Sequence, residues 1–286
     1  MPTPNSISVE KLVRLVGTAG CPVVVDVRAD NAFRDDRRLV PGSVRRAVAD
    51  IGRWSADLIG RSAVLVCRHG HDLSYGAAAY LRQAGVSAET LEGGFDAWEA
   101  AGLPLVPADK PRIRDEQGRT VWVTRGRPEV DCSACPWLIR RFVDPNAVFL
   151  FVPSTEILGV AERFHAVPFD IDVTGVFWSD CEELCTFWSH RGELCTFDVM
   201  IEELGLATPP LLHLATLVRG ADTARPDLAP EVAGLLAASL GLSRIYADDL
   251  AQLDAGMLLY DAFYRWCRDA TEETHNWPTN KRKERA

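Results

Sequence analysis

The feature that most constrains the fold is a loop at residues 67–74 that begins with a cysteine and reads Cys-Arg-His-Gly-His-Asp-Leu-Ser. The apolar run 63–66 before it predicts a buried strand, and the alanine-rich stretch 75–81 after it favours a helix. In such a unit the loop N–H groups and the helix N-terminus can converge on one anionic atom. Because the thiolate is the reactive form of cysteine, this arrangement predicts that Cys67 is a nucleophile. The alternative is an inert cysteine buried at the end of a core strand.

Length and composition indicate a globular protein of two domains. The chain has 286 residues, of which 47% are hydrophobic and 25% are charged. It shows neither a signal-peptide pattern nor an apolar run as long as a membrane span, so we expect a cytoplasmic protein without membrane contact. In a reducing compartment the eight cysteines are expected to be buried thiols, metal ligands or nucleophiles rather than disulfides.

The net charge of −9 is unevenly distributed, since acidic and basic residues balance within residues 1–107. The whole deficit therefore lies in residues 108–286. An acidic surface repels a phosphate backbone, so we do not expect nucleic-acid binding. The short basic tail at 279–286 is interpreted as a solvated chain end.

Predicted strands and helices alternate along residues 1–107. The expected strands are 22–28, 63–66 and 86–91, and the expected helices are 8–16, 51–59, 77–84 and 95–99. This alternation predicts an α/β domain with a parallel sheet and helices on both of its faces.

This domain resembles the rhodanese family. The resemblance rests on residues 25–28 (Val-Asp-Val-Arg), Pro41-Gly42, Cys67 with Gly70, residues 91–98 (Leu-Glu-Gly-Gly-Phe-Asp-Ala-Trp) and residues 102–104 (Gly-Leu-Pro). It implies that Cys67 carries a persulfide, takes sulfur from a small donor such as thiosulfate, and passes it to a thiol or another nucleophile. No cofactor is required for such a transfer. It also implies that the residues after Cys67 form the substrate-binding loop, namely Arg68, His69, Gly70, His71, Asp72 and Leu73.

The loop departs from the rhodanese pattern in its length, which exceeds the usual one by one residue. Related phosphatases of this fold have a longer loop that ends in an arginine, but here Leu73 stands at that position. Without the paired donors of a guanidinium, phosphate binding is weak, so phosphatase activity is not expected. The side chains of His69, His71 and Asp72 either tune the thiolate and bind an acceptor or point to solvent.

The rest of the chain predicts a charged linker at 108–119 and a mainly helical α+β domain at 120–278. Its expected strands are 120–125, 147–152 and 166–171. Its expected helices are a short one with Pro136 near its start and others at 197–204, 210–218, 230–240 and 245–273. Residues 177–186 are nearly repeated at 187–196, which we interpret as a local duplication that lengthens a loop.

The second domain resembles the C-terminal domain of the chromate-resistance (ChrB-like) family. The matching stretches are 122–125 (Trp-Val-Thr-Arg), 134–142, 189–198, 218–223, 241–243, 264–267 and 275–278 (His-Asn-Trp-Pro). Fusion of a rhodanese-like domain to this domain occurs in that family. The resemblance implies a link to chromate resistance and, in some members, to transcriptional regulation.

A metal site is one hypothesis for the second domain. Cys132 and Cys135 form half of a zinc pattern, and Cys181, Cys185, His190 and Cys195 could complete it. Of these candidates, we favour His190 and Cys195 as ligands, followed by Cys135. Cysteine and histidine suit a soft or borderline metal ion.

The other hypothesis is an oxyanion site that would bind chromate. Its candidate ligands are Arg125, Arg140, Arg141, Arg219 and Arg225. Alternatively, these arginines form structural ion pairs, for which the candidate partners are Asp131, Asp144, Asp198, Asp222 and Asp261.

Three functions follow from the sequence. The first is a sulfurtransferase acting through a Cys67 persulfide, with a role in resistance to chromate or oxidative stress. The second is a chromate-responsive sensor or transcriptional regulator, and the third is a chromate reductase that uses cysteine thiolates. The sequence leaves the oligomeric state open.

Overall fold

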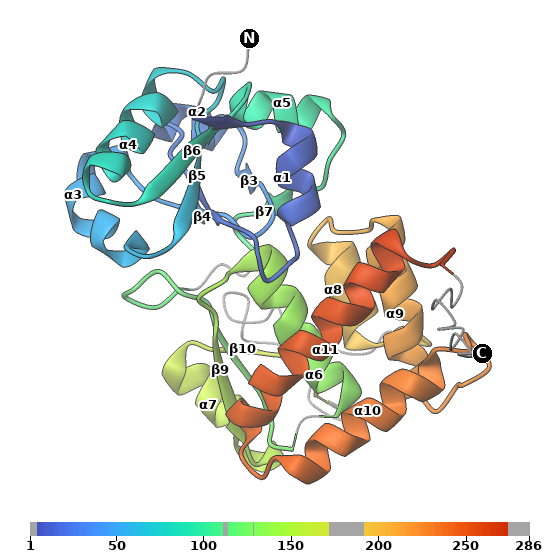
Figure 1. The fold of residues 1–286 in the computed structure, drawn as a ribbon. Helices are drawn as coiled ribbons and strands as arrows, with labels where there is room; N and C mark the ends of the chain where they lie inside the picture. Colours follow the sequence, from blue (N-terminus) through green and yellow to red (C-terminus); the bar gives the residue numbers. More distant parts are fainter. Residues whose placement is uncertain (1–4, 111–113, 128, 172–191, 274–286) are drawn as a thin grey trace, which may run out of the picture.

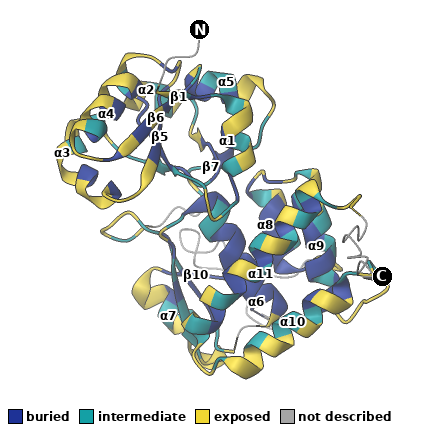
Figure 2. Cartoon of the chain, viewed as in Figure 1, coloured by how far each residue is buried: buried dark blue, intermediate teal, exposed yellow. Residues whose placement is uncertain are grey.

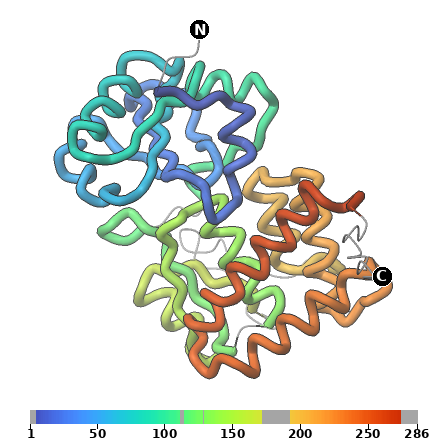
Figure 3. Tube along the Cα trace, viewed as in Figure 1, coloured from blue at the N-terminus to red at the C-terminus, as the bar shows by residue number. Residues whose placement is uncertain are grey.

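The computed structural model describes residues 5–110, 114–127, 129–171 and 192–273. The chain forms two lobes that meet along one side (Figure 1), and Figure 3 shows the same path as a continuous trace. The first lobe holds the blue and cyan part of the chain, up to about residue 107. The second lobe holds the green to red part. The near-duplication at 177–196 lies largely outside the described residues, as do Cys181, Cys185, His190 and the basic tail.

The first lobe is built on a parallel sheet. In the described chain its strands are ordered β1 (Ser6–Ile7), β6 (Ser87–Leu91), β5 (Ser62–Val66), β2 (Val23–Asp26) and β4 (Val44–Arg45). A short antiparallel pair, β3 (Arg38–Leu39) with β7 (Val106–Pro107), lies beside it. Central strands β2 and β5 are apolar on both faces because both faces are covered, as is usual in parallel sheets.

Helices cover both faces of this sheet, as the sequence predicted. Val24, Val64 and Leu91 point to the face covered by α1 (Val9–Leu15) and α5 (Gly94–Ala100). Val25 and Leu65 point to the opposite face, where α3 (Ile51–Trp54) and α4 (Asp72–Gln83) pack. One further helix, α2 (Asp30–Asp35), follows β2. Ser8 caps α1 by accepting a hydrogen bond from the Lys11 N–H at 3.3 Å.

The second lobe has a smaller parallel sheet in its described part, ordered β10 (Val167–Pro168), β8 (Val121–Arg125) and β9 (Val148–Val152). Helix α7 (Ile157–Phe164) packs against it. The remaining helices are α6 (Val130–Leu138), α8 (Thr196–Glu203), α9 (Pro209–Asp222), α10 (Val232–Ile245) and α11 (Asp249–Asp269). Figure 2 shows α6 as the buried centre of this lobe and α10 at its exposed outer edge. The expected mainly helical α+β domain is therefore confirmed.

Two predicted helix boundaries are wrong. Pro136 was expected near the start of a short helix, but α6 begins at Val130, and a π-helical turn over Ile139–Val143 continues it. All residues of α6 are buried, so packing against the neighbouring helices outweighs the cost of an interior proline. The long helix predicted from Ile245 is present as α11, but it starts later than predicted, because the chain turns at residues 246–248 and Asp248 caps the helix by accepting the Ala251 N–H at 2.8 Å.

The two lobes touch through a backbone hydrogen bond and through apolar side chains. The Gly42 N–H donates to the carbonyl oxygen of Phe142 at 2.6 Å. A side chain at Gly17 would place its Cβ 2.3 Å from the Phe142 ring, so a glycine is needed there. Trp98 of the first lobe and Tyr264 of the second belong to the same hydrophobic cluster. None of the helices described is long and apolar enough to cross a membrane.

Candidate functional site

Cys67 stands directly after β5 and ahead of the first turn of α4. Its Sγ accepts a hydrogen bond from the His71 N–H at 3.2 Å and lies 3.2 Å from the Ser74 hydroxyl. The same hydroxyl is 3.0 Å from the His71 carbonyl oxygen, which is itself 4.0 Å from the sulfur. The side chain is 4% exposed. An amide, a hydroxyl and a helix N-terminus therefore face one sulfur atom, which is an environment that accommodates negative charge.

The N-terminus of α5 holds the start of this loop in place. The Phe95 N–H donates to the Cys67 carbonyl oxygen at 2.9 Å, and the Asp96 N–H donates to the Arg68 carbonyl oxygen at 3.0 Å. These bonds need a close approach of two backbones. A Cβ on Gly94, which has a φ of +62°, would lie 2.3 Å from the Cys67 oxygen. A Cβ on Gly70 would lie 2.8 Å from the backbone nitrogen of Gly94. Gly70 of the loop and Gly94 of α5 therefore allow the two backbones to approach each other closely next to Cys67.

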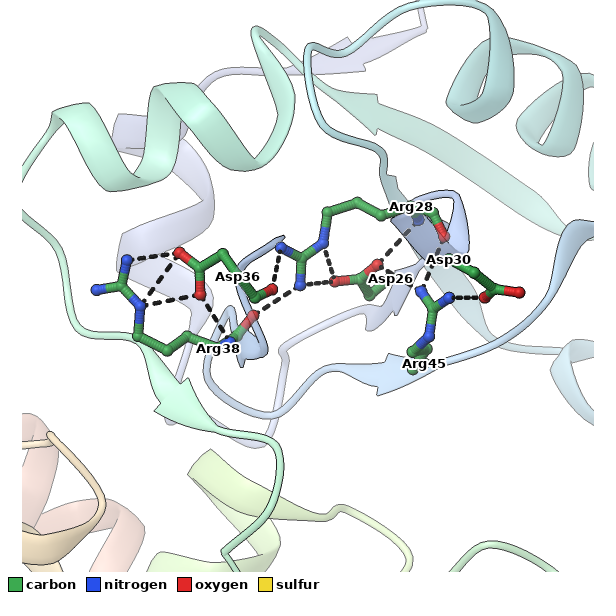
Figure 4. Close-up of polar contacts among 6 residues, drawn as sticks. All are labelled: Asp26, Arg28, Asp30, Asp36, Arg38 and Arg45. Carbon is green, nitrogen blue, oxygen red and sulfur yellow. Dashed lines mark hydrogen bonds and ion pairs between the residues drawn. The ribbon is translucent and has the colours of Figure 1, made fainter. Parts of the chain in front are cut away.

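The strand β2 leads into a buried ion pair between Asp26 and Arg28 (Figure 4). The Arg28 Nε donates to Asp26 Oδ2 at 2.7 Å, and its other nitrogens donate to the backbone oxygens of Asp36 and Arg38 at 3.1 and 2.6 Å. The guanidinium also lies over the Phe95 ring, 3.9 Å from its centroid. The Asp26–Arg28 motif is therefore connected to the Cys67 loop through Phe95.

Asp36 also takes part in this network through its side chain. Its carboxylate accepts from the Arg38 Nε at 3.0 Å, and hydrogen bonding from the Arg38 side chain lowers the pKa of Asp36. This pair fixes the segment whose backbone oxygens hold Arg28.

The predicted loop residues have different surroundings. The Arg68 side chain lies 3.2 Å from Asp35 and 3.6 Å from Asp96, and the His69 Nδ1 lies 2.8 Å from Asp96. Gly70 is buried against α5, and His71 contributes its amide while its side chain is exposed. Asp72 and Leu73 are the first two residues of α4.

Ser74 was missed as a site residue. Its side chain is buried, and its hydroxyl is as close to the sulfur as the His71 nitrogen is. The signal that could have identified it is its place on the first turn of the helix that follows the loop, where side chains can reach back to the loop.

Three further cysteines gather in the centre of the second lobe, and each donates to a carboxylate. Cys132 donates to Asp170 at 2.5 Å, Cys135 to Asp131 at 3.5 Å, and Cys195 to Asp198 at 3.1 Å. Burial, followed by the charges of nearby aspartates, raises the pKa of all three thiols.

The residues described here do not form the predicted metal site. Cys135 and Cys195 lie in the same buried region, but His190 is outside the described residues. In the described ranges no group of three or more His, Cys, Asp or Glu side chains is arranged to hold a metal ion. Asp131 instead accepts the N–H groups of Thr196 and Phe197 at 2.8 and 3.0 Å, at the start of α8.

The five arginines proposed as oxyanion ligands form ion pairs instead. The pairs are Arg125 with Glu129 and Asp170, Arg140 with Asp254, Arg141 with Asp261, Arg219 with Asp198, and Arg225 with Asp227. The expected partners Asp198 and Asp261 are confirmed. Of the other three expected partners, Asp144 pairs with Arg114, Asp131 accepts amides at the start of α8, and Asp222 accepts the Asp131 N–H.

Comparison with protein families identifies both lobes. The model described as "ChrB, C-terminal domain" matches residues 122–267, which is about half of the chain. The chain belongs to the ChrB C-terminal domain family. The model of the rhodanese-like domain matches residues 8–101. This ChrB-family chain therefore carries a rhodanese-like domain ahead of its ChrB domain, as the sequence motifs predicted.

Two curated relatives match parts of this ChrB-family chain. Protein ChrB of Cupriavidus metallidurans is 58% identical over 36 residues, which cover 13% of the chain and 11% of that protein. The chain thus aligns with only about a tenth of the length of that relative. Thiosulfate sulfurtransferase GlpE of Pseudoalteromonas translucida is 35% identical over 81 residues, or 28% of the chain and 74% of that protein.

Among solved structures, the chain is similar to a rhodanese-like domain protein from Staphylococcus aureus. The two are 24% identical, and the match covers 33% of this chain and 90% of that one with a TM-score of 0.30.

Proposed function

We propose that the rhodanese-like domain, taken as residues 1–107, is a sulfurtransferase in which Cys67 carries the sulfur. The observation that carries this proposal is the contact of the Cys67 sulfur with the His71 amide and the Ser74 hydroxyl, both at 3.2 Å. The His71 amide, joined by the Ser74 hydroxyl when its hydrogen turns from the His71 carbonyl to the sulfur, can stabilise an anionic sulfur without a positively charged side chain. The similarity to thiosulfate sulfurtransferase GlpE supports the same activity.

The proposed reaction has two displacement steps. The Cys67 thiolate attacks the outer sulfur of thiosulfate, the S–S bond of thiosulfate breaks, and sulfite leaves with the bonding electron pair. A nucleophilic acceptor, such as a thiolate or cyanide, then attacks the outer sulfur of the Cys67 persulfide and releases the thiolate. The loop residues 68–73 would bind the donor, and no cofactor takes part. The reaction needs reduced Cys67, which agrees with the cytoplasmic location expected from the sequence.

The test is a thiosulfate-to-cyanide assay on the full chain. Cys67→Ser should lower the rate by about 1,000-fold or more, because serine is a far weaker nucleophile for sulfur at neutral pH. Cys267→Ser, which changes a buried thiol in α11, is the matched control and should keep the activity. Equal rates for the wild type and Cys67→Ser would refute the proposal.

We propose that this activity serves resistance to chromate or oxidative stress, on the strength of the ChrB domain, taken as residues 120–278. A thiol-dependent chromate reduction at Cys135 or Cys195 has less support, because both thiols are buried and donate their hydrogens to aspartates. Growth on chromate of a deletion strain complemented with the wild type or Cys67→Ser checks this role. Equal protection by both genes would separate chromate resistance from sulfur transfer.

A further inference from the structure

A small apolar cavity lies where the two lobes meet. Its volume is about 160 Å³, and its lining comes from α1 and α5 of the first lobe and from α9 and α11 of the second (Figure 1). The apolar side chains around it include Val13, Trp98, Leu103, Phe142, Leu211 and Tyr264. A dry apolar cavity of about 150 Å³ is large enough to bind benzene. The space between the lobes can therefore hold the apolar part of a small molecule.

Among the residues described, one charged side chain lines this cavity, that of Arg268 near the end of α11. It is only 14% exposed. Its Nε and Nη2 face the neighbouring Asp269 and lie 3.2 and 3.1 Å from Oδ2. The remaining nitrogen, Nη1, is buried and has no hydrogen-bond partner within the described part of the chain. A buried donor without an acceptor is unfavourable, above all on a charged group.

The shape of the guanidinium indicates where Nη1 points. A planar guanidinium that holds a carboxylate through Nε and Nη2 carries Nη1 on its far side, so this atom faces away from Asp269. The group also lies over the Tyr264 ring, 5.6 Å from its centroid, and Tyr264 is part of the cavity lining. The Trp98 indole N–H is already used, since it donates to the Pro104 carbonyl oxygen at 2.9 Å. Arg268 is therefore the side chain that offers a charged donor to a molecule in the cavity.

The charges around Arg268 favour an anionic acceptor. Hydrogen bonding from the Arg268 side chain is the largest cause of a lowered pKa at Asp269. The same carboxylate pairs with the Arg265 Nε at 2.5 Å, and the charges of Arg265 and Arg14 lower its pKa further. Three guanidinium groups thus share this one carboxylate. A second carboxylate on Nη1 would balance the remaining positive charge, whereas a neutral acceptor would not.

We propose that the cavity binds a small carboxylate with an apolar body, of which an aromatic acid is the type. Its carboxylate accepts a hydrogen bond from Arg268 Nη1, and its ring lies among the apolar side chains of both lobes. Such a ligand stabilises the contact between the lobes because it touches both. Inorganic phosphate or sulfate is disfavoured, since the apolar lining would leave most of its oxygens without hydrogen bonds. Cys67 does not line this cavity, so the proposal stands apart from sulfur transfer.

Titration of the full chain with sodium benzoate tests the site, followed by NMR of the tryptophan indole N–H groups. The Trp98 signal, assigned with Trp98→Phe, should shift with a dissociation constant of about 1 mM or lower, whereas the buried Trp122 should not respond. Benzyl alcohol, which has the ring without the charge, should bind at least about 10-fold more weakly. A Trp98 signal that does not move, or equal affinity for both compounds, would overturn the proposal.

The role of the guanidinium is tested by Arg268→Gln, which should weaken benzoate binding at least about 10-fold. Arg265→Gln is the matched control, because it also removes a partner of Asp269 from α11 but changes a residue that does not line the cavity. It should bind benzoate as the wild type does. Wild-type affinity in Arg268→Gln, or the same loss in both variants, would refute the contact with Nη1.

Filling the cavity gives an independent test. Thr208 is half-buried, lines the cavity, and does not cap α9 through its side chain. Thr208→Phe should therefore place a ring in the space and abolish benzoate binding, while Thr155→Phe, at an exposed threonine elsewhere, should not. Benzoate should raise the midpoint of thermal unfolding of the wild type but not of Thr208→Phe. Circular dichroism confirms that each variant is folded, and a folded Thr208→Phe that binds benzoate normally would refute the location.

Discussion

Cys67 and the three buried cysteines of the second lobe differ in their hydrogen-bond partners. The Cys67 sulfur accepts an N–H from His71 at the start of α4. Cys132, Cys135 and Cys195 all donate to carboxylates. Donors stabilise an anionic sulfur, whereas a neighbouring carboxylate stabilises the neutral thiol. A cysteine's chemistry is therefore set by the polarity of its partners.

Burial alone does not make this distinction, since Cys67 is itself only 4% exposed. What differs is the backbone around it. The Cys67 loop ends in a helix N-terminus and is fixed by the amides of Phe95 and Asp96. In the other lobe Asp131 accepts the first two amides of α8. The Asp198 N–H there favours the Cys195 thiolate, but burial and the charges of Asp131 and Asp198 outweigh it and raise the pKa of this thiol.

The largest expected effect is on alkylation by iodoacetamide. In the folded protein Cys67 should react about 1,000-fold faster than Cys132 or Cys135, because desolvation together with the charges of nearby aspartates raises the pKa of those two thiols and keeps them protonated. Mass spectrometry of peptides after timed quenching measures each rate. Similar rates for Cys67 and Cys135 would show that their different hydrogen-bond partners do not set the reactivity of these cysteines.

Next in size is the effect of filling the space behind the loop. Gly94→Ala should destabilise the first lobe by about 3 kcal/mol, because its new Cβ would clash with the Cys67 carbonyl at a positive φ. Gly102→Ala is the control. Gly102 also has a positive φ, of +66°, but its Cβ would meet no atom within 4 Å, so a loss of about 1 kcal/mol is expected. Urea unfolding gives both values, and equal losses would show that contact with the loop does not matter.

Removing the hydroxyl beside the sulfur should have a moderate effect. Ser74→Ala should lower the thiosulfate-to-cyanide rate about 10-fold, the equivalent of one lost hydrogen bond to a charged group. Ser62→Ala changes an exposed serine at the start of β5 and should keep the rate. An unchanged rate in Ser74→Ala would mean that the amide alone stabilises the sulfur.

The smallest effect concerns alkaline stability. Burial and the charge of Asp170 raise the pKa of Cys132, so the folded chain keeps this proton where the unfolded thiol loses it. The resulting stability is complete below about pH 8 and falls as the pH rises above the ordinary thiol pKa of about 8.5. Cys132→Ser keeps a donor for Asp170 but does not titrate in this range. The wild type should therefore lose about 1 kcal/mol more per pH unit above pH 9.

Urea unfolding at pH 8, 9 and 10 measures this difference. Parallel stability curves for the wild type and Cys132→Ser would mean that Cys132 ionises as readily in the folded chain as in the unfolded one. Cys132 would then no longer count among the cysteines whose surroundings stabilise the neutral thiol.

Local patterns predicted much of the fold. The apolar run before Cys67 became β5, the alanine-rich stretch became α4, and the paired glycines Gly93 and Gly94 became the start of α5. Such features depend on periodicity and turn residues, which lie within a short window of sequence. Where packing outweighs local preference the prediction failed, as at Pro136 inside the buried helix α6.

The sequence by itself determined the two domains' families, the alternation of strands and helices in the first, and the position of Cys67 between a strand and a helix. Only the tertiary structure decided the partners of each polar group. Asp96 faces Arg68 and His69, Arg28 lies on Phe95, and the second lobe's cysteines meet aspartates, all through contacts between separate elements. The reason is physical: periodicity fixes which face of an element is buried, but the polar partners inside depend on how the elements pack.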